Sequence, residues 1–165
     1  MVVQGSSSTL ADSAVAWTPH APAPDQTSRY GVHMTLADDA LVVRGGIARD
    51  ASSVADRVED AIESDGVAVL SVYAGQASPT EDQSDLLLRI CRTADLRHGQ
   101  VQTARAGDLR AAGFEIRHEV ADGEQPNHYH VYFQVPMTEL QAQVFIDCFD
   151  GPKPNPRPAE ERKAR

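Results

Sequence analysis

The sequence predicts an α+β domain in which a mixed β-sheet carries about four helices. Two observations predict this class. Segments of strand length, in which apolar residues alternate with polar ones or form short unbroken runs, recur along the chain. Between them lie segments with apolar residues at helical spacing, each preceded by residues typical of helix starts. The predicted order is ββαβαβαββα, which fits a sheet with helices packed against it.

The first predicted strands form a hairpin. Tyr30 to Leu36 alternates apolar and polar residues, Ala37 to Asp39 turns the chain, and Leu41 to Val43 follows. Val67 to Tyr73 is a nearly continuous apolar run, which is typical of a strand buried on both faces. A further short strand is expected over Val101 to Thr103.

The predicted helices begin at capping residues and end at glycines. Three of them start at pairs that resemble capping boxes: Ser53 with Asp56, Thr80 with Gln83, and Thr138 with Gln141. A shorter helix is expected from Ala106 to Ala112. Gly66 and Gly113 are expected to end the first and third helices, and Gly151 with Pro152 to stop the last.

Both ends of the chain are predicted to lie outside the folded domain, which spans residues 29–151. Residues 1–28 are rich in Ser, Ala, Pro and Thr without a sustained period, so we expect them to be disordered. Residues 152–165 alternate prolines with polar residues and then become charged, which predicts an extended tail. Trp17 is an isolated aromatic residue in the first tail and is a candidate anchor for a partner.

Charge is unevenly distributed. The chain has a net charge of −9, yet residues 151–165 carry +3, so the first 150 residues carry −12. Such an acidic body disfavours binding to nucleic acid or anionic membranes and suits a basic partner. Neither a targeting signal nor a membrane-spanning run is recognisable, so we expect a cytoplasmic protein. The preference for arginine and alanine suggests a GC-rich bacterial source.

The segment Phe114 to Gln134 predicts a β-hairpin whose register can be derived. If Glu119 pairs with His128, all large apolar side chains of the hairpin fall on one face. In that register His128 and His130 share the opposite face, while His118 lies on the apolar one.

The shared face has three interpretations, one of which is an acid–base or partner-contact role of its side chains. Imidazoles at positions i and i+2 of a strand project the same way, so His128, His130 and the carboxylate of Glu119 are candidate ligands of a divalent metal. The alternative is a polar sheet face with Glu–His and Arg–His contacts across the strands. No other cofactor is expected.

A second alternative is nucleic-acid binding by a winged helix. The order of elements over residues 53–134 is that of a winged helix, and residues 86–118 carry a local net charge of +3. The 106–112 helix would then be the recognition helix, with Arg105 and Arg110 as candidate contacts. The loop that would form the wing contains Asp122 and Glu124 and no basic residue, which weighs against this interpretation.

Motifs of nucleophilic catalysis and phosphate loops are absent from the sequence, and Gly45-Gly46 extends into neither. The two cysteines, Cys91 and Cys148, fall on apolar helix faces, and their pairing is left open. The leading hypothesis is therefore a small, acidic, non-catalytic accessory or regulatory protein of a bacterium that acts through protein–protein contact. Its candidate partner-binding residues are Trp17, Arg117 and Tyr132.

Overall fold

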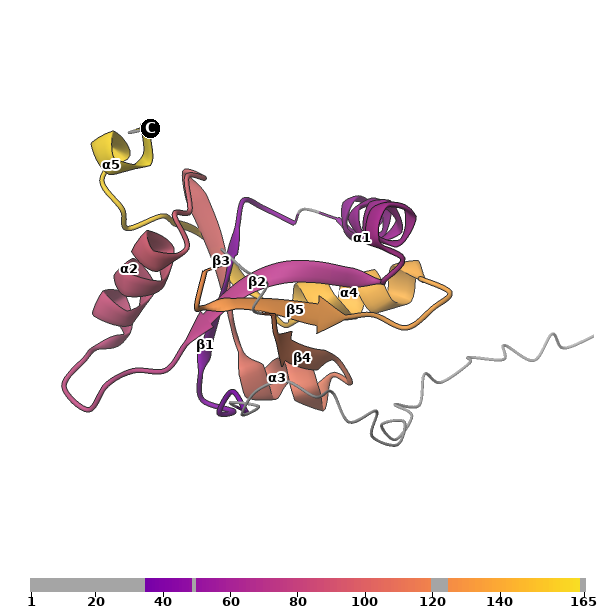
Figure 1. Ribbon diagram of the computed structural model, residues 1–165, viewed down its shortest axis with the longest axis horizontal. Coiled ribbons are helices and arrows are strands. Elements are labelled where there is room, and N and C mark those ends of the chain that lie inside the picture. Colours follow the sequence, from indigo (N-terminus) through magenta and orange to yellow (C-terminus); the bar gives the residue numbers. More distant parts are fainter. Residues whose placement is uncertain (1–34, 49, 120–124, 164–165) are drawn as a thin grey trace, which may run out of the picture.

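The computed structural model describes residues 35–48, 50–119 and 125–163, which form an antiparallel sheet with helices on both faces (Figure 1). The strand order is β4-β5-β2-β1-β3-β6. Trp17, the segment 1–28 and nearly all of the predicted strand Tyr30–Leu36 lie outside the described residues.

The described strands are β1 (Leu41–Gly45), β2 (Val69–Gly75), β3 (Gln100–Arg105), β4 (Glu115–His118), β5 (His128–Tyr132) and β6 (Asp150–Pro154). The described helices are α1 (Ala51–Asp65), α2 (Gln83–Thr93), α3 (Ala106–Ala111), α4 (Glu139–Asp147) and α5 (Ala159–Lys163). The α+β class is confirmed, and the order from β1 to α4 follows the prediction. None of these helices combines the length and apolar composition that crossing a membrane requires.

The sheet is antiparallel at every described ladder, whereas the sequence predicted a mixed sheet. A helix between two strands usually returns the chain so that the strands run parallel. Here β1 and β2 are joined through α1 yet pair antiparallel, as Leu41 faces Gly75 and Val43 faces Tyr73. The chain therefore re-enters the sheet at the same end at which β1 left it, after passing through α1.

Helix starts follow the aspartates rather than the predicted serine and threonine in two of three cases. The Asp50 carboxylate caps α1 by accepting a hydrogen bond from the backbone N–H of Ser53 at 2.8 Å. Asp82, not Thr80, caps α2. Thr138 caps α4 as predicted. An ionised carboxylate accepts a stronger hydrogen bond than a hydroxyl, so a nearby aspartate takes the capping position.

The larger core lies between the sheet and the helices α1, α3 and α4. Its most buried members are aliphatic or aromatic: Val42, Val72 and Val131 from the sheet, Val54 and Val58 from α1, Leu109 from α3, and Phe145 from α4. Alternating residues of each strand point to this face, which is why β1, β2 and β5 contribute every second side chain.

A smaller core lies on the other face, under α2. It joins Leu41 and Val43 of β1 to Leu86, Ile90 and Cys91 of α2. Among the described elements, α2 is the helix on this face, and it contacts β1 and β2 (Figure 1). The same face of β4 and β5 is left without a described helix, and this region holds the side chains considered next.

The C-terminal segment corrects the prediction of an extended tail from residue 152. Residues 150–154 form β6 on the outer side of β3, and the side chains of Asn155 and Arg157 are buried. The Asn155 amide donates to the carbonyls of Leu96 at 3.0 Å and His98 at 2.8 Å. The polar side chains of Asn155 and Arg157 donate to backbone carbonyls of the domain instead of facing solvent. The amino-acid composition of a segment does not distinguish these two roles.

Candidate functional site

The hairpin has the register that the sequence predicted. Glu115 pairs with Tyr132 and Arg117 with His130 across β4 and β5. His118 lies on the core side, where its ring packs on Tyr129 with centroids 4.8 Å apart. The register prediction and the separation of His118 from the other two histidines are therefore confirmed.

His128 and His130 lie together, with ring centroids 4.8 Å apart and planes at 90°. His128 is buried and packs near the ring of Tyr73. His130 Nδ1 is 4.0 Å from Glu119 Oε1, and that same oxygen accepts a hydrogen bond from the Tyr132 hydroxyl at 2.9 Å. The described residues contain no group of three or more His, Cys, Asp and Glu side chains placed to hold a metal ion. Metal binding by this pair stays a prediction.

Beside α2, the same side of β5 and β4 has no described helix over it, and together with the adjoining residues of β2 it forms a surface that we call the open face. It comprises Ser71, Tyr73, His130, Tyr132, Glu115 and Arg117. The Arg117 guanidinium stacks over the Tyr132 ring, 4.5 Å from its centroid, and forms two hydrogen bonds to the Glu115 carboxylate at 2.6 and 2.8 Å. Arg117 is thus held by a cation–π contact and an ion pair on the strand where the sequence placed it opposite His130.

The helix that the winged-helix interpretation took as a recognition helix packs into the sheet domain, and nucleic-acid binding stays a prediction. α3 is six residues long, and its Ala106 and Leu109 are buried in the larger core. Arg110 pairs with the Asp38 carboxylate and also donates to a backbone carbonyl. Arg105 donates to the carbonyl of Asp39 at 2.6 Å. Both candidate nucleic-acid contacts therefore hold the loop before β1 in place.

The two thiols lie in different cores on opposite faces of the sheet, so they do not pair. Burial raises the pKa of Cys91 and of Cys148 to about 11. Since the usual value is near 9.0, the thiolate fraction at neutral pH falls about a hundredfold. We expect iodoacetamide to alkylate the native protein slower than the urea-unfolded chain by about that factor. Rapid loss of free thiols in native protein, followed by mass spectrometry, would contradict this.

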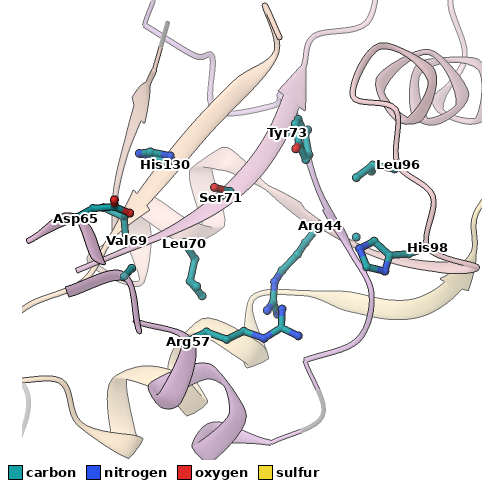
Figure 2. Close-up of a pocket in the computed structure, with 12 residues that line it drawn as sticks. Arg44, Arg57, Asp65, Val69, Leu70, Ser71, Tyr73, Leu96, His98 and His130 are labelled. Carbon is teal, nitrogen blue, oxygen red and sulfur yellow. The ribbon is translucent and has the colours of Figure 1, made fainter. Parts of the chain in front are cut away.

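A second feature was not predicted: β1 and β2 diverge. Their ladder ends at the pair Val43–Tyr73. Beyond it β1 continues along β3 to the pair Gly45–Val101, while β2 continues along β5. The opening is a cleft of about 370 Å³, shown in Figure 2. It is lined from β1 by Arg44, from α1 by Arg57, and from the loop before β3 by His98.

Arg44 is the unusual residue of this cleft. It is 5% exposed, and its Nη1 atom has no hydrogen-bond partner among the described residues. Its guanidinium packs over the Phe145 ring at 5.9 Å. Burial first, and then the charge of Arg57, lower the pKa of Arg44 to about 10. Arg44 therefore remains protonated at neutral pH, in a place that is poor in both water and partners.

The absence of a side chain at Gly45 leaves space for the His98 ring beside the cleft. A Cβ atom on Gly45 would lie 2.5 Å from His98 Cδ2, so only glycine leaves room for the ring. The sequence held a signal for this site. Arg44 follows Val42 at a spacing of two, and a strand residue at that spacing points to the same buried face. A cation at a core-facing strand position calls for a partner.

The search for related proteins adds no assignment to this geometry. Comparisons with family models, with curated proteins and with solved structures found no match to the chain.

Proposed function

We propose that this protein is a small accessory or regulatory protein of a bacterium that binds another protein through the open face. One observation carries the proposal: a row of Tyr, His and Arg side chains occupies the part of the sheet face, over β4 and β5, that α2 does not cover and over which no other described helix packs. The opposite side of the same strands is covered by α1 and α4 and forms the larger core. A sheet buried on one side and aromatic on the other is suited to docking on a partner.

The side chains of the open face are of the type that contributes most to protein interfaces. Tyr and Arg dominate interface hot spots. Arg117 is 52% exposed, yet its guanidinium is already fixed by Glu115 and the Tyr132 ring. Tyr132 is oriented by its hydrogen bond to Glu119. Because these side chains are ordered before binding, a partner loses less side-chain entropy when it docks.

The charge of the protein indicates the character of the partner. The chain carries −9, and α1 presents several exposed acidic side chains: Asp56, Glu59, Asp60, Glu63 and Asp65. Charges of this kind speed association with an oppositely charged protein and slow it with a similar one. We therefore propose a partner of net positive charge, which the overall charge of this protein attracts.

The first test replaces Arg117 with alanine. We expect Arg117→Ala to weaken the partner complex by about tenfold or more, because arginines that are stacked and ordered before binding are typical interface hot spots. The full-length protein is used to isolate the partner from its native host. The dissociation constant of the purified pair is then measured by calorimetry.

The chain contains a closely matched control. Arg97 is 54% exposed and pairs with Asp95 two residues before it, just as Arg117 pairs with Glu115. Arg97→Ala removes the same charge and the same kind of ion pair away from the open face. Equal weakening by Arg97→Ala would assign the effect to net charge and sink the proposed interface. So would a partner whose affinity neither variant changes.

A further inference from the structure

Arg44 and Arg57 differ from the other described arginines in having no acceptor. Six arginines pair with a carboxylate: Arg89, Arg92, Arg97, Arg110, Arg117 and Arg157. Arg105 and Arg162 donate to backbone carbonyls. Among the described residues, neither Arg44 nor Arg57 has a hydrogen bond or an ion pair. The chain holds 24 acidic residues, so carboxylates are plentiful elsewhere.

Placing the positive charges of Arg44 and Arg57 close together, with Arg44 buried, costs free energy through desolvation and electrostatic repulsion. A buried charge is retained in proteins when it is paired, and an unsatisfied buried donor calls for an explanation. Figure 2 shows the two side chains converging from β1 and α1, with His98 on the far side of Arg44. Asp65 also lines the cleft, but it lies at the other end, beside Val69. Among the described residues, the two arginines therefore lie together at an end of the cleft where no carboxylate pairs with them.

We infer that this cleft binds a phosphate group. The two guanidiniums supply the paired N–H donors that match phosphate oxygens, and the His98 ring stands at the rim as a further donor. Arg44 is the deep ligand, held by the Phe145 ring beneath it. Arg57 is the outer ligand. A phosphate carries about −1.5 to −2 charges near neutral pH, so it offsets two arginines better than a single carboxylate does.

The size and direction of the cleft suit a phosphate that is part of a small molecule. Its volume of about 370 Å³ is at the small end of ligand sites. From the arginines the cleft runs past Ser71 and Tyr73 toward His130, which are residues of the open face. A phosphate monoester therefore has room for its organic part there, whereas inorganic phosphate would occupy the arginine end alone. This inference is independent of the proposed protein partner.

The test titrates the full-length protein with inorganic phosphate, with phosphoserine and with acetate at constant ionic strength. Calorimetry gives each dissociation constant, and thermal unfolding gives the shift in Tm. We expect saturable binding of phosphate or phosphoserine and a raised Tm. Tighter phosphoserine binding identifies a monoester site, and tighter phosphate binding a site for the free ion. Acetate that binds as tightly as both would overturn a phosphate site.

Variants separate the site from the general charge of the protein. Arg57→Gln changes an exposed side chain, and we expect it to weaken phosphate binding by about tenfold or more. Arg97→Gln removes the same charge beside His98 without touching the cleft, and we expect a change of less than about twofold. Equal losses in the two variants, or no saturable binding by the wild type, would reject the site.

Arg44→Met tests the deep ligand. Methionine keeps much of the length and the apolar packing on Phe145 while it removes the unpaired charge. We expect this variant to fold with an unchanged or higher Tm and to lose phosphate binding. If it binds phosphate as the wild type does, the inference fails. If it does not fold, Arg57→Gln decides the question. Arg117→Ala should bind phosphate normally, which keeps this result separate from the protein interface.

Discussion

Phe145→Ala is expected to lower the free energy of unfolding by about 4 kcal/mol, the largest single effect among the substitutions considered. Phe145 is fully buried, and three other rings pack on it: Phe114 at 5.7 Å, Phe133 at 5.2 Å and Phe149 at 4.9 Å between centroids. Truncation leaves a cavity that rigid strands and α4 cannot close. Small domains are stable by only about 5–15 kcal/mol, so this loss is a large part of the total free energy of unfolding. Urea denaturation of the variant and the wild type measures the difference.

The control for this prediction lies on the same helix. Leu140 is 56% exposed, so Leu140→Ala should change stability by less than about 0.5 kcal/mol. Phe145→Ala also removes the ring under the Arg44 guanidinium, so phosphate binding should weaken in the same variant. A loss of stability below about 1.5 kcal/mol would mean that the core repacks around the deleted ring.

Asn155→Ala is expected to cost about 3 kcal/mol, since each unsatisfied buried polar group costs about 1–3 kcal/mol. The Asn155 amide donates to the carbonyls of Leu96 and His98, and its Oδ1 accepts from the backbone N–H of Arg157 at 3.0 Å. Alanine leaves all three groups without this partner. We expect the variant to show a reduced unfolding free energy and faster proteolysis between β6 and α5.

Its neighbour provides the comparison. Pro156 lies in the same segment but is exposed, so Pro156→Ala should leave stability nearly unchanged. If residues 152–165 were the extended tail that composition predicts, Asn155→Ala and Pro156→Ala would behave alike. Protease resistance of this segment in wild type and its loss in Asn155→Ala distinguish the two cases.

The hairpin could be predicted to the residue because a strand has a strict period of two. A shift of β4 by one residue would have sent Phe114 and Ile116 to the solvent side while Val131 stayed in the core, so only one register kept all three on one face. Gly66 was likewise predictable as a helix end, and it adopts the left-handed conformation at φ 75°. The sequence thus predicts features that depend on one hairpin or one helix, such as strand register and helix ends.

The cleft could not be predicted in the same way. Arg44, Arg57 and His98 belong to three elements, and they meet only because β1 and β2 separate after Val43–Tyr73. Strand divergence depends on twist and on the partners each strand finds on its other side. His128 and His130 could be recognised as a candidate site from the sequence because they are two residues apart on one strand. Its carboxylate partner, Glu119, bonds Tyr132.

Sheet direction and the C-terminal segment were missed for related reasons. Both depend on where a segment docks rather than on its composition. Arg157 holds the C-terminal segment against the domain, because its guanidinium donates to the Asp95 carboxylate at 2.9 Å and to the Leu96 carbonyl at 3.2 Å. Those acceptors lie about sixty residues earlier in the chain, at sequence separations of 62 and 61. No pattern local to residues 152–163 reveals them.

The outermost strands of the described sheet have a consequence for how another chain can approach. β6 contains Pro152 and Pro154, which lack the N–H groups that an added strand would need. β4 is four residues long and carries Glu115 and Arg117. Short, charged or proline-containing borders are poor templates for further strand pairing. Self-association into ribbons is thus discouraged, and a binding partner is expected to lie flat across the strands instead of extending the sheet.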